Sequence, residues 1–549
     1  MGGIKVLTDI EIATQNKQLS ILKIAKKLGL KKADLELYGD NIAKIKLYNQ
    51  LKKKQGKLIL ITSINPTKSG EGKSTISIGL ADALSALKKN TCLTLREPSL
   101  GPVFGIKGGA CGGGYSQVVP MENINLHFTG DMHAITSANN LLSAIIDNHI
   151  HQGNELKIKN VFFERCVDIN DRALKNITLA NERHDKFTIT SASEIMAILT
   201  LSKDLKDLKR RLSNIIVGEN ESGGLVYARD LHAENAMTIL LKDAIKPNLV
   251  QTLEHTPAII HCGPFANIAH GCNSTIATLF SLSHANYTVT EAGFGADLGA
   301  EKFLDLKCQT NGIAPDCVCL VVTVKALKLH GGELFENLKN ENIEAVISGC
   351  ENMKRHIENI KSVYKLPVIV AINRFYTDTQ NELNAIQNIA NNMGVDTEIV
   401  TSFENGSSGA IELAKKVIKI CEHKNEIEFV YNLSDNVKTK IEKIATKIYH
   451  ANSVKYSKDA EKVFDVIEKN NYNNLPIVIA KTQSSFSDNK ELLNAPENFD
   501  ITITDLKIRG GAEFIVAIAG NMLLMPGLSK YSAYEKMTID DNGKIDGLF

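Results

Sequence analysis

Ile64-Asn65-Pro66-Thr67-Lys68-Ser69-Gly70-Glu71-Gly72-Lys73-Ser74-Thr75 is the stretch that decides the fold of this 549-residue chain. It directly follows residues 58–64, an apolar run that is typical of a buried strand. Gly70 and Gly72 allow the backbone to turn tightly, so that successive N–H groups can converge on one anion. The pattern therefore predicts a strand that leads into a glycine-rich phosphate-binding loop.

The residues after the glycines supply groups that a nucleotide needs. Lys73 can bind the β- and γ-phosphates, and the hydroxyl of Ser74, or alternatively that of Thr75, can bind Mg²⁺. Apolar residues recur at near-helical spacing over residues 73–88, which predicts a helix whose N-terminus lies under the phosphates. By itself, this loop indicates only that the protein binds a nucleoside triphosphate.

The loop departs from the standard phosphate-loop pattern at its start. Thr67 stands where the pattern has Gly, and Lys68 lies five residues before Lys73, as in ATPases that resemble the nitrogenase iron protein. Lys68 can reach a phosphate or face solvent, and Glu71 favours the positive end of the following helix dipole. The candidate ATP-binding residues of this segment are Thr67, Lys68, Ser69, Gly70, Glu71, Gly72, Lys73, Ser74 and Thr75.

The composition is that of a globular enzyme. Hydrophobic residues make up 43% and charged residues 23%, and the net charge of +1 creates no field that attracts nucleic acid or anionic membranes. The ten cysteines include no CxxC pair, which suits free thiols in a reducing compartment. Residues 1–20 lack the apolar core of a signal peptide, and residues 514–525 are far short of the ~20 that span a membrane. We expect a cytoplasmic protein with no nucleic-acid or membrane partner.

Short apolar runs rich in β-branched residues alternate with helical patterns along much of the chain. This order predicts an α/β fold of the P-loop NTPase type, in which a mainly parallel sheet carries helices on both faces. The expected strands are residues 57–64, 161–166, 258–262, 287–291, 317–324 and 367–372, and a clear helical stripe covers residues 135–150.

The alternation weakens after Asn373, where residues 475–481 and 499–508 look like strands of a smaller unit. At roughly 150 residues per domain, the length suits three to four domains. We expect a large phosphate-loop domain with two smaller C-terminal α/β domains, with boundaries at residues 1–365, 366–460 and 461–549.

Polar residues follow several predicted strands, at the carboxyl ends where ligands bind in parallel sheets. Arg96 and Glu97 follow an apolar run, and the next segment, residues 105–114, holds six glycines in ten positions. Such a segment cannot form a stable helix, but its N–H groups can approach an anion closely. Asn373 ends another predicted strand, where related ATPases place an Asn that contacts the base, so it is a candidate adenine contact.

Two further residues leave more than one interpretation open. Asp131 stands before the helix predicted at 135–150, and it either caps that helix or faces the site as a base or water-positioning group. His270 lies in a strand–loop–helix junction, where a histidine without metal-ligand spacing is more often a hydrogen-bonded structural residue than a base.

Several long motifs together resemble formate–tetrahydrofolate ligase, also called formyltetrahydrofolate synthetase. They include Arg-Glu-Pro-Ser-Leu-Gly-Pro at 96–102 and Thr-Glu-Ala-Gly-Phe-Gly at 290–295. The other matching segments are residues 65–67, 70–73, 105–110, 130–134, 263–271, 525–528 and 547–549. The resemblance covers essentially the whole chain.

The resemblance implies that formate, MgATP and tetrahydrofolate give 10-formyltetrahydrofolate, ADP and phosphate. In this family formate attacks the γ-phosphate to give formyl phosphate, and nitrogen-10 of the folate then attacks the formyl carbon. Phosphoryl transfer needs positioning and neutralisation of charge, which suits Lys73, the loop N–H groups and Arg96. The implied catalytic residues are Lys73, Arg96, Glu97 and Asp131.

Two aromatic side chains hold the folate in this family, and by position they resemble Phe375 and Phe403. The second position commonly carries Trp, whereas this chain has no Trp at all. The resemblance also implies a homotetramer that a monovalent cation, K⁺ or NH₄⁺, activates.

Two other classes of protein remain as alternatives. A regulatory ATPase of the iron-protein type would use nucleotide to switch partner binding, with Lys68 at a dimer interface and no need for folate. A scaffold that kept the fold without catalysis would bind no nucleotide.

Overall fold

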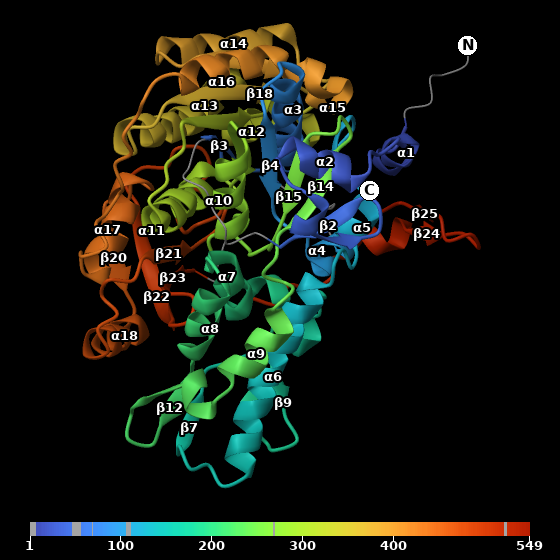
Figure 1. The fold of residues 1–549 in the computed structure, drawn as a ribbon. Coiled ribbons are helices and arrows are strands. Elements are labelled where there is room, and N and C mark those ends of the chain that lie inside the picture. Colours follow the sequence, from blue (N-terminus) through green and yellow to red (C-terminus); the bar gives the residue numbers. More distant parts are fainter. Residues whose placement is uncertain are drawn as a thin grey trace.

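The computed structural model describes residues 7–46, 56–67, 70–105, 111–266, 269–520 and 524–548. Within these residues a twelve-stranded sheet forms the centre of the molecule (Figure 1). Its main path has the order β1 (Leu35–Tyr38), β2 (Ile42–Ile45), β14 (Asn248–Thr252), β15 (Pro257–Ile260), β4 (Thr91–Leu95), β16 (Tyr287–Glu291), β3 (Lys57–Ser63), β17 (Cys317–Val322), β18 (Val368–Asn373) and β19 (Thr397–Val400). Beside this path, β6 (Ser116–Val119) pairs with β14 and with β5 (Gly112–Gly113).

The sheet is parallel over most of its width. The seven strands from β15 to β19 along this path pair in parallel. At the other edge β1, β2, β6 and β14 pair antiparallel. The predicted α/β fold with a mainly parallel sheet is therefore confirmed.

Helices cover both faces of this sheet. They are α3 (Lys73–Ala86), α10 (Thr275–His284), α12 (Val324–His330), α13 (Ile343–Glu358), α14 (Gln380–Asn392) and α16 (Ile411–Cys421). In β3, Leu58 and Leu60 belong to a core cluster with residues of α12, α13 and α14, whereas Ile59 and Ile61 belong to a cluster with α3 and α16. Because successive side chains of a strand point to opposite faces, both faces are buried.

A second group of elements extends from the sheet and lies below it in Figure 1. Its helices are α6 (Asp131–His151), α7 (Glu194–Leu201), α8 (Leu205–Ser213) and α9 (Glu234–Leu241), and its three-stranded sheet comprises β7 (Ile158–Val161), β12 (Ile216–Asn220) and β13 (Leu225–Tyr227). The helix predicted at 135–150 is confirmed within α6.

The strand predicted at residues 161–166 as part of the main sheet is wrong. Val161 ends β7, and β8 (Arg165–Val167) pairs with β11 (Phe187–Ile189) in a separate two-stranded sheet. Phe162 between them is 47% exposed, and Arg165 forms ion pairs with Asp147 and Asp185. A short apolar run does not reveal which sheet it joins, and here Phe163 is buried among residues of α6 and α7.

The C-terminal part contains a four-stranded sheet in the order β20 (Ser453–Tyr456), β22 (Asp500–Arg509), β23 (Phe514–Ala519) and β21 (Ile477–Ala480), with α17 (Val437–Lys447) and α18 (Lys458–Lys469). The strands predicted at 475–481 and 499–508 correspond to β21 and β22. β18 and β19 lie after the expected boundary at residues 365/366, yet they pair within the main sheet. The division into 1–365, 366–460 and 461–549 stays a prediction.

The remaining elements are short. They are α1 (Asp9–Gln15), α2 (Ile21–Lys27), α4 (Leu100–Phe104), α5 (Met121–Asn125), α11 (Gln309–Asn311), α15 (Ser402–Asn405), β9 (Ile177–Thr178), β10 (His184–Asp185), β24 (Thr538–Ile539) and β25 (Ile545–Asp546). All ten cysteines are free and buried. Among the described residues, no helix has both the length and the apolar character to cross a bilayer.

Candidate functional site

The carboxyl ends of the parallel strands place most of the predicted site residues along one edge of the sheet. Ser63 ends β3 before the phosphate loop, and Glu291 and Asn373 end β16 and β18. Arg96 and Glu97 directly follow β4. The predicted loop residues Lys68 and Ser69 lie outside the described residues.

The phosphate loop needs its two glycines. Gly70 and Gly72 have φ values of +77° and +75°, in the left-handed region that glycine adopts without strain. A Cβ atom at Gly72 would also lie only 2.3 Å from Nδ2 of Asn373. That Nδ2 atom donates a hydrogen bond to the carbonyl oxygen of Glu71 at 3.0 Å. Asn373 therefore supports the loop backbone, and its role as an adenine contact stays a prediction.

The side chain of Glu71 stabilises the loop through two hydrogen bonds. Its buried carboxylate accepts a hydrogen bond from the backbone N–H of Thr67 at 2.6 Å and another from the hydroxyl of Thr323. Thr323 follows β17, so one side chain ties the start of the loop to the neighbouring strand end. The sequence suggested only a favourable contact with the helix dipole.

Lys73 and Ser74 begin α3 and point to groups at the strand ends. The Nζ atom of Lys73 donates to Oγ of Ser63 at 3.2 Å. The hydroxyl of Ser74 donates to Oε2 of Glu291 at 2.9 Å, and Glu291 is buried. Two oxygen ligands from a phosphate loop and an adjacent acidic residue suit the Mg²⁺ ion of a nucleotide.

Sequence reasoning did not single out Glu291, although it lies within a quoted motif. The sequence could have indicated Glu291 as a site residue, because it is an acidic residue at the end of a predicted strand. What the sequence did not show is that β16 pairs directly with β3, with Glu291 opposite Ile61.

Arg96 lies between two glycine-containing loops. Its Nη1 atom donates to the carbonyl oxygen of Pro264 at 3.3 Å, and a Cβ atom at Gly293 would come within 3.2 Å of the same nitrogen. Its Nε atom is buried and has no hydrogen-bond partner among the described residues. A half-buried guanidinium with an unused buried donor suits an anionic ligand.

Glu97 is buried next to Arg96 in the chain. Its backbone N–H donates to Cys262 at 2.8 Å, but Oε2 has no partner within the described part of the chain. Burial, and after it the charge of Asp131, raises the pKa of Glu97 well above its ordinary value. The environment thus favours the protonated carboxyl, and the ionised form is a stronger base than an exposed carboxylate.

Asp131 does not cap α6, which excludes one of the two interpretations. The N-cap is Gly130, and the carboxylate of Asp131 instead receives hydrogen bonds from Nζ of Lys44 at 2.8 and 3.0 Å and from Nδ2 of Asn248 at 2.8 Å. All three side chains are buried. Lys44, in β2, is a partner that sequence reasoning missed, and a catalytic role for Asp131 stays a prediction.

Phe375 and Phe403 follow neighbouring parallel strands, β18 and β19, in which Asn373 lies opposite Val400. The ammonium of Lys325 lies 4.3 Å from the centre of the Phe375 ring. Phe403 is 50% exposed, and a Cβ atom at Gly113 would lie 3.0 Å from its ring. Both rings are thus available at the same edge as the loop.

His270 differs from the expectation of a hydrogen-bonded structural residue. It is fully buried, and neither ring nitrogen has a partner among the described residues. Burial, with smaller contributions from Lys307 and Arg96, lowers the pKa of His270 to about 3. The imidazole is therefore neutral and surrounded by cations.

Comparison with known proteins agrees with this geometry. The family model described as "Formate--tetrahydrofolate ligase" matches residues 7–549. A protein of Campylobacter concisus (strain 13826), named "Formate--tetrahydrofolate ligase", is 52% identical over 550 residues, which cover 99% of this chain and 100% of that protein. The chain belongs to the formate–tetrahydrofolate ligase family.

Proposed function

We propose that this protein joins formate to tetrahydrofolate in a reaction driven by MgATP, giving 10-formyltetrahydrofolate, ADP and phosphate. The name of the family and of its 52% identical member supports the ligation itself. The observation that carries the nucleotide part is the hydrogen bond from Ser74 to the buried Glu291, directly beside Lys73. Together these groups can hold the phosphates and the metal ion of the substrate MgATP.

The first step transfers the γ-phosphoryl group to formate. A formate oxygen attacks the γ-phosphorus, the bond to the bridging oxygen breaks, and ADP leaves with the electron pair. Negative charge develops on the phosphoryl oxygens, and Lys73, the loop N–H groups and Arg96 would neutralise it. The product is formyl phosphate, in which phosphate is a good leaving group.

The second step transfers the formyl group to nitrogen-10 of tetrahydrofolate. Nitrogen-10 attacks the formyl carbon, the carbon–oxygen bond to phosphate breaks, and nitrogen-10 loses its proton. A guanidinium can bridge phosphate and carbonyl oxygens, which suits Arg96. Glu97 in its ionised form, which burial makes a stronger base than an exposed carboxylate, would accept the proton.

The pterin ring needs a flat apolar slot, for which we propose Phe375 and Phe403. Phe403 is 50% exposed, so part of its ring is open to a ligand, and Phe375 lies beside Lys325 at the same edge of the sheet. Stacking between two aromatic rings would hold the folate near the end of the phosphate loop.

One assay tests this proposal against the two alternatives. ADP release is measured with ATP alone, with formate or tetrahydrofolate added singly, and with both together. We expect steady-state release only when both are present. ADP release that does not depend on folate would overturn the ligase proposal in favour of a regulatory ATPase. Absence of nucleotide binding would favour a scaffold.

We also propose that the protein is a homotetramer in the cytoplasm and that K⁺ or NH₄⁺ activates it, as the family resemblance implies. Light scattering tests whether the protein is a homotetramer. Reaction rates in K⁺, NH₄⁺ and a large organic cation test the activation by a monovalent cation, and equal rates in all three would contradict it.

A further inference from the structure

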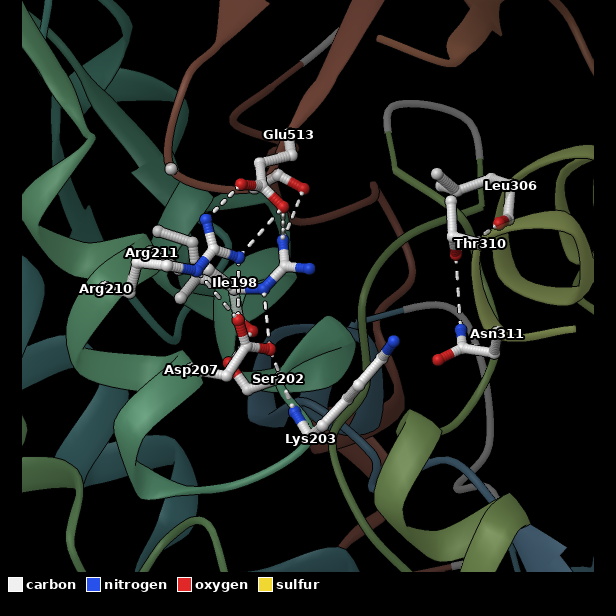
Figure 2. A network of polar contacts seen from close by, with 12 residues as sticks. Ile198, Ser202, Lys203, Asp207, Arg210, Arg211, Leu306, Thr310, Asn311 and Glu513 are labelled. Atoms are coloured by element: carbon white, nitrogen blue, oxygen red, sulfur yellow. Dashed lines mark hydrogen bonds and ion pairs between the residues drawn. The ribbon is translucent and has the colours of Figure 1, made fainter. Parts of the chain in front are cut away.

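A cavity of about 230 Å³ lies where three parts of the chain meet, away from the predicted catalytic residues. α7 and α8 form one wall, residues 306–311 form the second, and the turn between β22 and β23 forms the third. The charged lining comes from Lys203, Asp207, Arg210, Arg211 and Glu513, and the neutral polar lining comes from Thr310 and Asn311 (Figure 2). None of these residues belongs to the candidate site.

The charges in this cavity do not cancel. Two carboxylates, Asp207 and Glu513, face two guanidiniums: Arg211 pairs with them at 3.1 and 3.0 Å, and Arg210 pairs with Asp207 at 2.7 Å and also with Glu513. These four charges balance. Lys203 is the fifth charged residue of the lining and leaves one surplus positive charge.

Two hydrogen-bond donors in the cavity are unused. Among the described residues, neither Nζ of Lys203 nor Nη2 of Arg211 has a hydrogen bond or ion pair to another group. Arg211 as a whole is only 9% exposed, but its Nη2 atom is not sealed off, so a molecule in the cavity can reach it. Figure 2 shows the Lys203 side chain extending across the cavity toward Asn311.

One acceptor in the same lining is also unused. The Nδ2 atom of Asn311 donates to the carbonyl oxygen of Lys307 at 2.7 Å and to Oγ1 of Thr310 at 3.2 Å, which fixes the orientation of the amide. Its Oδ1 atom is buried and accepts no hydrogen bond from the described residues. A complementary ligand therefore carries negative charge and also one acidic hydrogen.

We propose that this cavity binds inorganic phosphate. At neutral pH free phosphate is an anion that keeps at least one P–OH group. Its anionic oxygens would accept from Lys203 and Arg211, and its P–OH would donate to Oδ1 of Asn311. Sulfate has a similar size and charge but no O–H, and the dianion of a phosphate monoester also lacks one, so both should bind more weakly.

Calorimetric titration of the full-length protein tests the proposal, with phosphate, sulfate and glycerol phosphate as separate probes. Excess Mg²⁺ and a non-hydrolysable ATP analogue are present throughout, to keep phosphate away from the nucleotide loop. We expect phosphate to bind most tightly. Lys203→Gln should weaken phosphate binding by about tenfold or more, because it removes one charge-assisted hydrogen bond. The matched control Lys206→Gln, three residues further along the chain in α8 and outside the cavity lining, should leave it unchanged.

Asn311→Ala provides the second arm, because it removes only the acceptor. Its phosphate affinity should fall to its sulfate affinity, with sulfate binding unchanged. In crystals soaked with arsenate, which also keeps one O–H, the anomalous signal should lie between Lys203 and Asn311. Equal phosphate binding by wild type and Lys203→Gln, no preference over sulfate, or no arsenate signal in the cavity would each overturn the proposal.

Discussion

The contact between Ser74 and Glu291 links one hydroxyl of the phosphate loop to the end of the next strand. Glu291 is buried, and its Oε2 atom lies 2.9 Å from Oγ of Ser74. The parallel pairing of β16 with β3 places Glu291 at the sheet edge from which the phosphate loop leads into α3. Under the proposed function, the pair would be preorganised for the divalent cation of the nucleotide.

Removing the charge of Glu291 should weaken the use of Mg²⁺. Glu291→Gln keeps an oxygen that can accept from Ser74, so we expect the fold to persist. The Mg²⁺ concentration that gives half-maximal rate should rise about tenfold or more, because a carboxylate is a far better Mg²⁺ ligand than an amide. Initial rates over a Mg²⁺ titration measure this, and an unchanged Mg²⁺ requirement would remove Glu291 from the metal site.

Truncating Phe403 should raise the KM for tetrahydrofolate and leave the KM for ATP unchanged. We expect Phe403→Ala to raise the KM for tetrahydrofolate by an amount equal to about 1–3 kcal/mol, the cost of losing one flat ring from an aromatic stack. Tyr376→Ala is the matched control, since Tyr376 follows Phe375 but is 81% exposed. Equal effects of Phe403→Ala on the KM values of both substrates would mean that this ring only packs.

At the residue scale, the sequence revealed groups that lie close along the chain and missed those that meet only after folding. The loop glycines, Lys73 and Ser74 could be predicted because one turn contains them all. The ion pair of Asp131 with Lys44 could not, since 87 residues separate the partners.

At the scale of elements, helix α3 stands out because it is almost completely buried. It follows the phosphate loop directly and is buried on nearly all sides, from Thr75 to Leu84. Asp82 lies within this buried stretch. Its Oδ1 atom accepts from the hydroxyl of Thr252 at 2.6 Å, and its Oδ2 atom has no partner among the described residues. Burial raises the pKa of Asp82 from 3.8 to about 7.

This pKa shift makes the contribution of Asp82 in α3 to the stability of the fold depend on pH. Because the folded pKa of Asp82 exceeds the unfolded pKa, its protonated form stabilises the fold below about pH 4, and this contribution is lost as the pH rises through 7. We expect Asp82→Asn to remove the dependence. The free energy of unfolding of wild type relative to the variant should fall by up to about 4 kcal/mol over this range.

Urea unfolding at several pH values measures the difference between wild type and Asp82→Asn. Taking the difference cancels the titration of all other groups. Parallel pH profiles for the two proteins would show that Asp82 is ionised in the fold already near pH 4.

The sequence predicted elements well in the middle of the sheet and poorly at its edges. β3, β17 and β18 are mainly apolar on both faces, which is the continuous pattern of a buried parallel strand. β1 has the sequence Leu-Glu-Leu-Tyr with exposed residues, so its pattern is too short and too polar to predict an edge strand.

At the scale of the whole molecule, a buried network joins the phosphate loop to the C-terminal sheet. Asn65, which precedes the loop, donates from Nδ2 to Oδ1 of Asp297 at 3.0 Å and to the carbonyl oxygen of Gln483 at 3.2 Å. Oδ2 of Asp297 lies 2.7 Å from Nζ of Lys481, just after β21. His330 adds a bond from Nε2 to the Asn65 carbonyl oxygen at 2.9 Å.

This arrangement connects the C-terminal sheet to the residues that lead into the phosphate loop. Lys481 and Asp297 are both fully buried, so each charge depends on the other for compensation. Loss of either charge would disturb the hydrogen bonds that hold Asn65, and therefore the position of the residues that lead into the phosphate loop.

Lys481→Met should therefore lower the free energy of unfolding by about 3–5 kcal/mol, because it leaves the Asp297 carboxylate buried without a counter-charge. Adding Asp297→Asn should restore much of this loss, since a neutral amide needs no counter-charge and still accepts from Asn65. The control Lys490→Met breaks only an exposed ion pair with Glu491, at 3.8 Å, and should cost at most about 1 kcal/mol. Urea unfolding of the four proteins measures these values. If the double variant is no more stable than Lys481→Met, the two residues act independently and the network does not couple the C-terminal sheet to the loop.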